Sequence, residues 1–257
     1  MNNVQWNAFC EYRDRLKDLC GKWMNYSPAL KELQKAAGAK DTPDYPLETA
    51  VVYNTAYDEI NREDEIKLIV IGDNPGKEEQ LSANRRYLVG QSGRIAEGFF
   101  RRNPSLKIDF RKNVVIMNKT PVHTAKTSHL RYLIKNGGSE MKKLILESQI
   151  EMARMASKLH RKLIEGSSGD YEPELWLVGY SELKGKGLFL PYRDELKKSY
   201  GTSETWNKVF VYQHFSMNRF LIDLRNCMKE NGNLSMKEAL EKLGRQHRDE
   251  IFCSGSI

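Results

Sequence analysis

Polar side chains that could do chemistry follow three apolar runs of this chain. They are Asp73 and Asn74 after the first run, Asn118 after the second and His214 after the last. A carboxylate or an amide can orient a water molecule, an Asn side chain both donates and accepts hydrogen bonds, and a His can stabilise developing negative charge. The set suits the polarisation and hydrolysis of a small, hydrogen-bonding ligand.

Each signal is weak by itself. Gly72-Asp73-Asn74-Pro75-Gly76 is also ordinary turn chemistry, and a lone Asn at a strand end is usually a turn former. The sequence lacks a GxxxxGK[ST] phosphate loop, a GxGxxG segment after the first apolar run and a GxSxG nucleophile elbow. Common nucleotide hydrolases, dinucleotide-binding enzymes and serine hydrolases are therefore disfavoured.

The elements that must position these side chains are strands alternating with helices. Apolar runs predict strands at 66–71, 113–117, 174–178 and 208–212. Helical spacing predicts helices at 4–24, 28–37, 47–57, 94–102, 128–135, 139–165, 188–200, 218–229 and 235–251. Ser92 is the expected N-cap of the fourth helix, and residues 166–170 are expected to form a loop.

This alternation predicts an α/β fold: a single three-layer α/β/α domain with a short four-stranded parallel sheet. Residues 1–60 form a helical N-terminal extension packed on the domain, and residues 66–225 carry the motifs. Because the carboxyl ends of parallel strands share one edge of the sheet, Asp73, Asn74, Asn118 and His214 are expected to line one cleft.

Composition sets broader limits on the chain of 257 residues. Its net charge of +7 and pI near 9.1 suit a polyanionic partner. No run approaches the roughly 18 apolar residues of a membrane helix, and no secretory signal is visible, so a cytoplasmic protein without a membrane partner is expected. Cys10, Cys20, Cys227 and Cys253 form no CxxC pair, which favours reduced structural thiols and predicts neither a metal nor another cofactor.

Four segments, taken in order, resemble the uracil-DNA glycosylase superfamily. Residues 72–79 (GDNPGKEE) resemble its first motif, and residues 87–93 (YLVGQSG) resemble a segment of its iron–sulfur family. Residues 117–121 (MNKTP) resemble the strand end that carries the base-reading Asn, and His214-Phe215-Ser216 with Arg219 resembles the His-Pro-Ser motif. The chain looks like a divergent member with mixed features of the iron–sulfur and the single-strand-selective or mismatch-type families.

The resemblance implies a DNA repair enzyme of base excision that hydrolyses, without metal, the N-glycosidic bond of uracil or a related deaminated base flipped out of DNA. Asp73 or Asn74 would orient the water, and the choice between them stays open. Asn118 would read the uracil edge, and His214 would stabilise charge at uracil O2. The implied roles of the others are base contact for Gly72, Tyr87 and Leu88, and DNA contact for Ser92, Phe215, Ser216 and Arg219.

Departures from the family pattern keep two alternatives open. Leu88 stands where the family has a stacking Phe, with Tyr87 as a possible substitute, and Phe215 replaces the Pro after the motif His. Phe215 could also be an intercalating side chain. The four cysteines do not match the family's cluster spacing. The chain could thus be a catalytically inactive nucleic-acid-binding protein with the same fold, or a nucleobase- or nucleoside-binding protein. A monomer is expected in each case.

Overall fold

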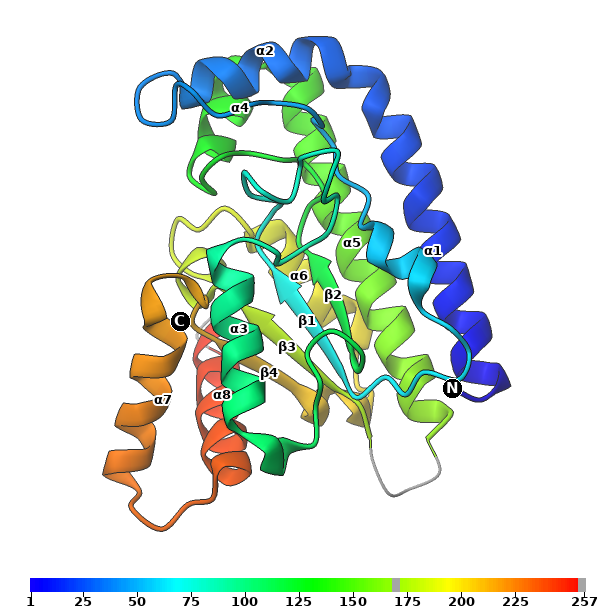
Figure 1. Ribbon diagram of the computed structural model, residues 1–257, viewed down its shortest axis with the longest axis vertical. Helices are drawn as coiled ribbons and strands as arrows, with labels where there is room; N and C mark the ends of the chain where they lie inside the picture. The colour runs from blue at the N-terminus through cyan, green and yellow to red at the C-terminus, as the bar shows by residue number, and fades with distance from the viewer. Residues whose placement is uncertain (168–171, 254–257) are drawn as a thin grey trace.

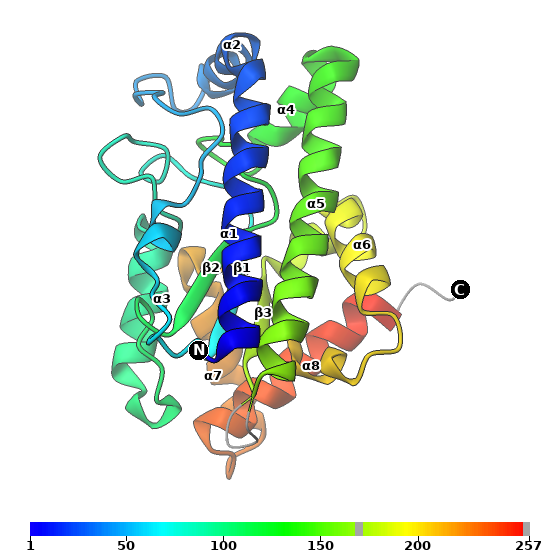
Figure 2. The ribbon, with the colours of Figure 1, turned by 90° about the vertical axis from the view of Figure 1, so that its right-hand side faces the viewer.

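A computed structural model describes residues 1–167 and 172–253. Its sheet has four parallel strands in the order β2-β1-β3-β4, with bounds Leu68–Gly72 (β1), Val114–Asn118 (β2), Glu174–Val178 (β3) and Val209–Tyr212 (β4). Helices cover both faces of the sheet (Figures 1 and 2). The predicted α/β fold with a four-stranded parallel sheet is confirmed.

Apart from Glu174 at the start of β3 and Asn118 at the end of β2, the strands consist of buried apolar residues, glycine and Tyr212, as expected of a sheet covered on both faces. Successive side chains of a strand point to opposite faces. Ile69 and Ile71 of β1 therefore join the core under one helical layer, whereas Leu68 and Val70 join the core under the other. The two cores on opposite sides of one sheet make the three layers.

The first helical layer consists of α1 (Asn3–Trp23), α2 (Ser27–Gly38), α4 (His129–Asn136), α5 (Gly138–Glu165) and α6 (Leu190–Tyr200). The second consists of α3 (Gln91–Arg102), α7 (Arg219–Glu230) and α8 (Met236–Cys253). None of the helices in the described ranges is long and apolar enough to cross a membrane.

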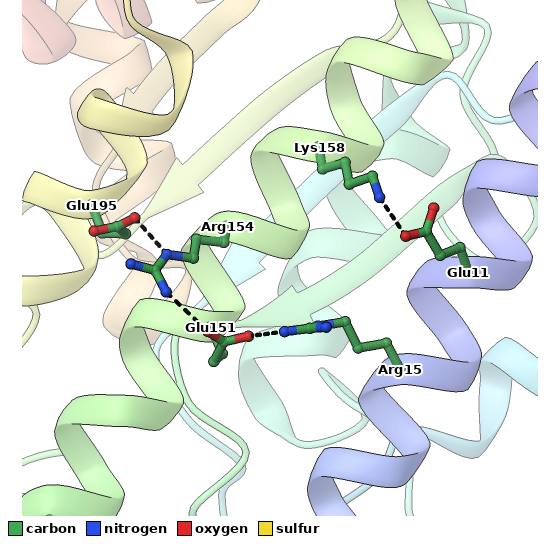
Figure 3. A network of polar contacts seen from close by, with 6 residues as sticks. All are labelled: Glu11, Arg15, Glu151, Arg154, Lys158 and Glu195. Carbon is green, nitrogen blue, oxygen red and sulfur yellow. Dashed lines mark hydrogen bonds and ion pairs between the residues drawn. The ribbon is translucent and has the colours of Figure 1, made fainter.

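The N-terminal extension is part of the first layer. Helix α1 lies along α5, and α2 lies above the carboxyl ends of the strands near α4 (Figures 1 and 2). Ion pairs link α1 to α5 through Arg15–Glu151 and Glu11–Lys158, and Arg154 of α5 reaches α6 at 2.7 Å (Figure 3). These exposed pairs contribute little stability each, so the buried apolar contacts of α1 hold the extension in place.

The sequence-based elements differ from the structure at two places. Residues 47–54 are not helical: Val51 pairs antiparallel with Val122, and only Thr55–Glu59 forms a 3-10 turn. The β-branched Val51 and Val52 favour this extended conformation. The pairing covers the edge of the segment 121–123, which follows β2 at the side of the sheet. Ser92 lies inside α3, whose N-cap is Gly90. The loop predicted at 166–170 lies partly outside the described residues.

The connections place the sheet's ligand-binding edge next to β1. The chain runs from β1 through α3 to β2 on one side, then through α4 and α5 to β3 on the other side of β1. Doubly wound sheets bind ligands beyond the carboxyl ends of the strands where the order reverses in this way. Residues after β1 and β3 are therefore the ones expected to meet a ligand.

Candidate active site

A cavity of about 480 Å³ lies at this edge of the sheet. It brings together most of the residues singled out in the sequence: Asp73, Asn74, Leu88, Ser92, Asn118, His214, Ser216 and Arg219. A second cavity, of about 410 Å³, is lined by residues from the opposite, amino-terminal ends of β1 and β3 and contains none of these groups. The predicted convergence of the polar strand ends is thus present in the structure.

Asn118 is the last residue of β2 and is 2 % exposed. Its Nδ2 has no hydrogen-bond partner among the described residues. A side chain on Gly72, its neighbour across the sheet, would lie 2.6 Å from Asn118 Oδ1. Gly72 itself does not line the cavity; its missing side chain gives the Asn118 amide its room. A buried amide donor with no partner is costly, so this geometry favours a ligand that supplies an acceptor.

His214 follows β4 and is held by Ser216 two residues later. The backbone N–H of Ser216 donates to His214 Nδ1 at 3.1 Å, and the Ser216 hydroxyl lies 2.8 Å from the same nitrogen. Because Nδ1 accepts, a neutral ring carries its proton on Nε2. Burial lowers the pKa of His214 below its ordinary 6.5, which favours that neutral form. The ring therefore offers one N–H donor.

Asp73 follows β1 and is paired with a buried lysine. Lys119 Nζ lies 2.6 Å from Asp73 Oδ1 and donates to the carbonyl oxygens of Val178 (2.6 Å) and Gly72 (3.3 Å). Lys119 is 0 % exposed, and burial lowers its pKa from 10.5 against the opposing effect of Asp73. Gly179 has φ +98°, and a Cβ there would lie 2.3 Å from Asp73 Oδ1. The ion pair thus ties the ends of β1, β2 and β3 together.

Asn74, the next residue, points its amide at the neighbouring loop. Its Nδ2 donates to Thr124 Oγ1 (2.8 Å) and to the Val122 carbonyl (3.2 Å). Asn74 also lines the cavity, and because its nitrogen is held by this loop, its Oδ1 remains as the acceptor of the side chain.

Two aromatic residues that the sequence associated with substrate are in the core instead. Tyr87 is buried, donates to the Val52 carbonyl at 2.6 Å and does not line the cavity. Phe215 is fully buried against Phe220, with ring centroids 5.0 Å apart. The expectations that Tyr87 stacks on a base and that Phe215 intercalates or contacts DNA are therefore wrong. Met217 lines the cavity and is 73 % exposed, so it places an apolar side chain at the rim.

Sequence reasoning missed two charged residues. Lys119 directly follows Asn118, and Glu79 ends the first motif. Because charged side chains are seldom buried, the sequence alone suggests that both are exposed to solvent. Glu79 lines the cavity, is 7 % exposed and accepts hydrogen bonds from the backbone N–H groups of Gly76 (3.0 Å) and Leu88 (2.9 Å). The acidic pair Glu78-Glu79 was the available signal.

Within residues 1–167 and 172–253, no group of three His, Cys, Asp or Glu side chains is placed to hold a metal ion. Cys10 and Cys20 lie on α1, Cys227 on α7 and Cys253 at the end of α8, and all four are free thiols. No protein-family model matches this chain, and no curated protein is significantly similar to it.

Proposed function

We propose that this protein is a DNA glycosylase that hydrolyses the N-glycosidic bond of uracil or a related deaminated base flipped out of DNA. The observation that carries the proposal is that the unpartnered Asn118 amide and the Nε2–H of His214 line one cavity. A uracil edge offers carbonyl oxygens on either side of an N–H. Asn118 supplies a donor and an acceptor for O4 and N3–H, and His214 supplies a donor for O2.

His214 acts on the leaving group in this proposal. Cleavage of the glycosidic bond leaves its electron pair on the base, and the negative charge gathers on oxygen. A fixed neutral N–H donor stabilises that charge in the transition state more than the neutral base in the ground state. Protonation of the ring would also give a donor, but Ser216 N–H already donates to Nδ1, so the neutral ring fits its surroundings better.

Asn74 positions the water. Asn74 lines the cavity and its nitrogen is held by the 122–124 loop, so its Oδ1 remains to accept a hydrogen bond from the attacking water. Asp73 already gives one oxygen to Lys119 and contributes negative charge beside the positively charged sugar that forms in the transition state. The pairing of Asp73 with Lys119 therefore supports Asn74 as the group that holds water.

DNA binding is assigned to the exposed rim of the cavity. Arg219, Lys126 and Ser216 line it and can meet phosphate oxygens. Met217 projects from a rim segment in which it and Asn218 both have left-handed backbone, at φ +55° and +56°. An exposed apolar side chain at that place can fill the gap left by a flipped base. A cytoplasmic monomer acting on DNA is part of the proposal.

The test is base release from oligonucleotides carrying one uracil, single-stranded and paired with G or A, followed by alkaline cleavage. We expect strand scission with the wild type, a rate at least about a hundredfold lower for His214→Ala, and an unchanged rate for His247→Ala, a His on α8 outside the cavity. No scission on any substrate contradicts the proposal. Salt-sensitive DNA binding without scission instead supports an inactive DNA-binding protein. Two observations fit that outcome: Leu88 replaces the stacking Phe of the family, and the Asp73 carboxylate is paired with Lys119.

A further inference from the structure

Glu79 joins two loops that form one wall of the cavity. Its Oε2 accepts from the N–H of Gly76 in the first motif, and its Oε1 accepts from the N–H of Leu88 in the 87–93 segment. The side chain is 7 % exposed and lines the cavity. One buried carboxylate therefore sets the distance between the loop that carries Asn74 and the loop that carries Leu88.

Leu88 needs such support because its backbone is left-handed, with φ +51°. A Leu rarely adopts this conformation without restraint from its surroundings. Here its N–H is held by Glu79, and its carbonyl accepts from Arg111 Nη2 at 2.7 Å. The start of α3 closes over the same carbonyl, since a Cβ on Gly93 would lie 1.5 Å from it. Leu88 thereby stays at the cavity wall, at the position where the resemblance implies a stacking aromatic, while it also packs in the buried core on the α3 side of the sheet.

We propose that Glu79 is a positioning residue of this site: the ionised carboxylate holds Leu88 and Gly76 in the arrangement that receives the base, and protonation loosens that wall. The inference rests on the proposed glycosylase function. Protonation turns one acceptor oxygen into a hydroxyl that faces an N–H donor, so one of the two hydrogen bonds is weakened. Excision is then expected to need the ionised form.

The titration of Glu79 falls near neutral pH. Burial raises its pKa to about 7, against the opposing effects of the Gly76 and Leu88 N–H groups and of Arg111. The other charged or titratable groups that line the cavity are Asp73, Lys126, Glu182, His214 and Arg219. Burial lowers the pKa of His214 below 6.5, so the ring is already neutral at pH 7 and does not account for an acid limb centred there.

The experiment compares Glu79→Gln with Glu78→Gln, its exposed neighbour. Single-turnover uracil release from a single-stranded oligonucleotide is measured from pH 5.5 to 8.5. We expect the wild-type rate to fall about tenfold from pH 8 to pH 6 with a midpoint near 7. Glu78→Gln should keep this profile. Glu79→Gln should be slower at pH 8 and lose the limb, because its amide cannot accept both N–H groups. A Glu79→Gln enzyme with the wild-type rate and profile overturns the inference.

A second measurement separates this inference from the proposed activity. Thermal unfolding at pH 8 is followed for Leu88→Gly, Glu79→Gln and the double variant. Glycine accepts left-handed backbone freely, so the change in stability caused by Glu79→Gln should be smaller in size when Leu88 is already Gly. Non-additive shifts support the role of Glu79 even if no base is released and the glycosylase proposal fails. Additive shifts overturn the bracing role even if uracil is excised.

Discussion

Replacing Lys119 by Met should destabilise the fold far more than removal of any surface lysine. The side chain is 0 % exposed and bonds to Asp73, to Gly72 of β1 and to Val178 of β3. Met is unbranched and close to Lys in length, so it keeps most of the packing on Phe189, whose ring centroid lies 4.9 Å from Nζ, but it leaves the buried Asp73 carboxylate without its partner. Breaking a buried ion pair by removing one member costs about 3–5 kcal/mol.

For a protein of this size each kcal/mol moves the midpoint of thermal unfolding by about 2–4 °C, so Lys119→Met should lower it by about 6–20 °C. Lys143→Met is the matched control, since Lys143 pairs with Glu147 at 3.6 Å on the exposed face of α5. An exposed pair contributes less than about 1 kcal/mol, so the control should shift the midpoint by no more than about 4 °C.

The assay is circular dichroism during heating, with Asp73→Asn/Lys119→Met as a third variant. Removing both charges leaves no uncompensated carboxylate, so the double variant should recover at least about half of the lost stability. Full recovery is not expected, because the Gly72 and Val178 carbonyls still lose a donor. A Lys119→Met protein as stable as the control, or a double variant no more stable than Lys119→Met, would refute the reasoning.

Three further predictions follow from the same region. Gly179→Ala should cost about 1–3 kcal/mol in urea unfolding, because φ is +98° and a Cβ would lie 2.3 Å from Asp73 Oδ1. The cost should exceed that of Gly185→Ala, where φ is +57° and nothing lies within 4 Å of the added Cβ. Asn118→Asp should slow uracil release roughly 10- to 100-fold in the oligonucleotide assay, since a carboxylate lacks the Nδ2 donor. The pKa of Glu79 is raised from 4.5 to about 7 in the fold, so the folded protein binds this proton more tightly than the unfolded chain does. The resulting stabilisation is complete below pH 4.5 and is lost as the pH rises through 7. Between these pH values the unfolding free energy of the wild type, measured relative to Glu79→Gln, should fall by about 3 kcal/mol.

The Glu79 prediction brings out a conflict between stability and the proposed activity. Desolvation makes the ionised carboxylate unfavourable in the fold, yet only that form accepts both the Gly76 and the Leu88 N–H groups. Ionisation of Glu79 near pH 7 does not stabilise the fold, so a purely structural role does not explain why a carboxylate stands here. Sites that bind or catalyse commonly hold such locally unfavourable groups, and the left-handed Leu88 beside it is a second instance.

Much of the fold could be predicted from the sequence because its strands are short apolar runs that end in polar loops. Short apolar runs of this kind are typical of parallel strands that are buried on both faces. The predicted strand positions agree with β1–β4 to within two residues at each end. The helix expected at 47–57 failed because its pattern is local, whereas the pairing of Val51 with Val122 joins residues 71 positions apart in the sequence. Tertiary pairing overrode the local periodicity there.

The candidate site could be predicted only in part, because a motif gives residue types but not the direction of each side chain. Asn118 and His214 lie at strand ends, where the topology alone brings them together. Tyr87 and Phe215 sit in loops, where nothing local distinguishes a ring that faces a ligand from one that faces the core. Tyr87 is held by the Val52 carbonyl, 35 positions away, and Phe215 packs on Phe220 in a core that residues of several strands and helices complete.

The relation between Asp73 and Asn74 depends in the same way on a residue far along the chain. Both side chains follow β1 and both line the cavity, so their spacing from the strand does not distinguish them. Lys119 does: by pairing with Asp73 it fixes one carboxylate as a structural charge shared by three strand ends. Asn74, held only through its nitrogen, keeps an oxygen for the cavity. Because Lys119 directly follows Asn118, the residue that fixes the charge and the residue proposed to read the base are both held at the carboxyl end of β2.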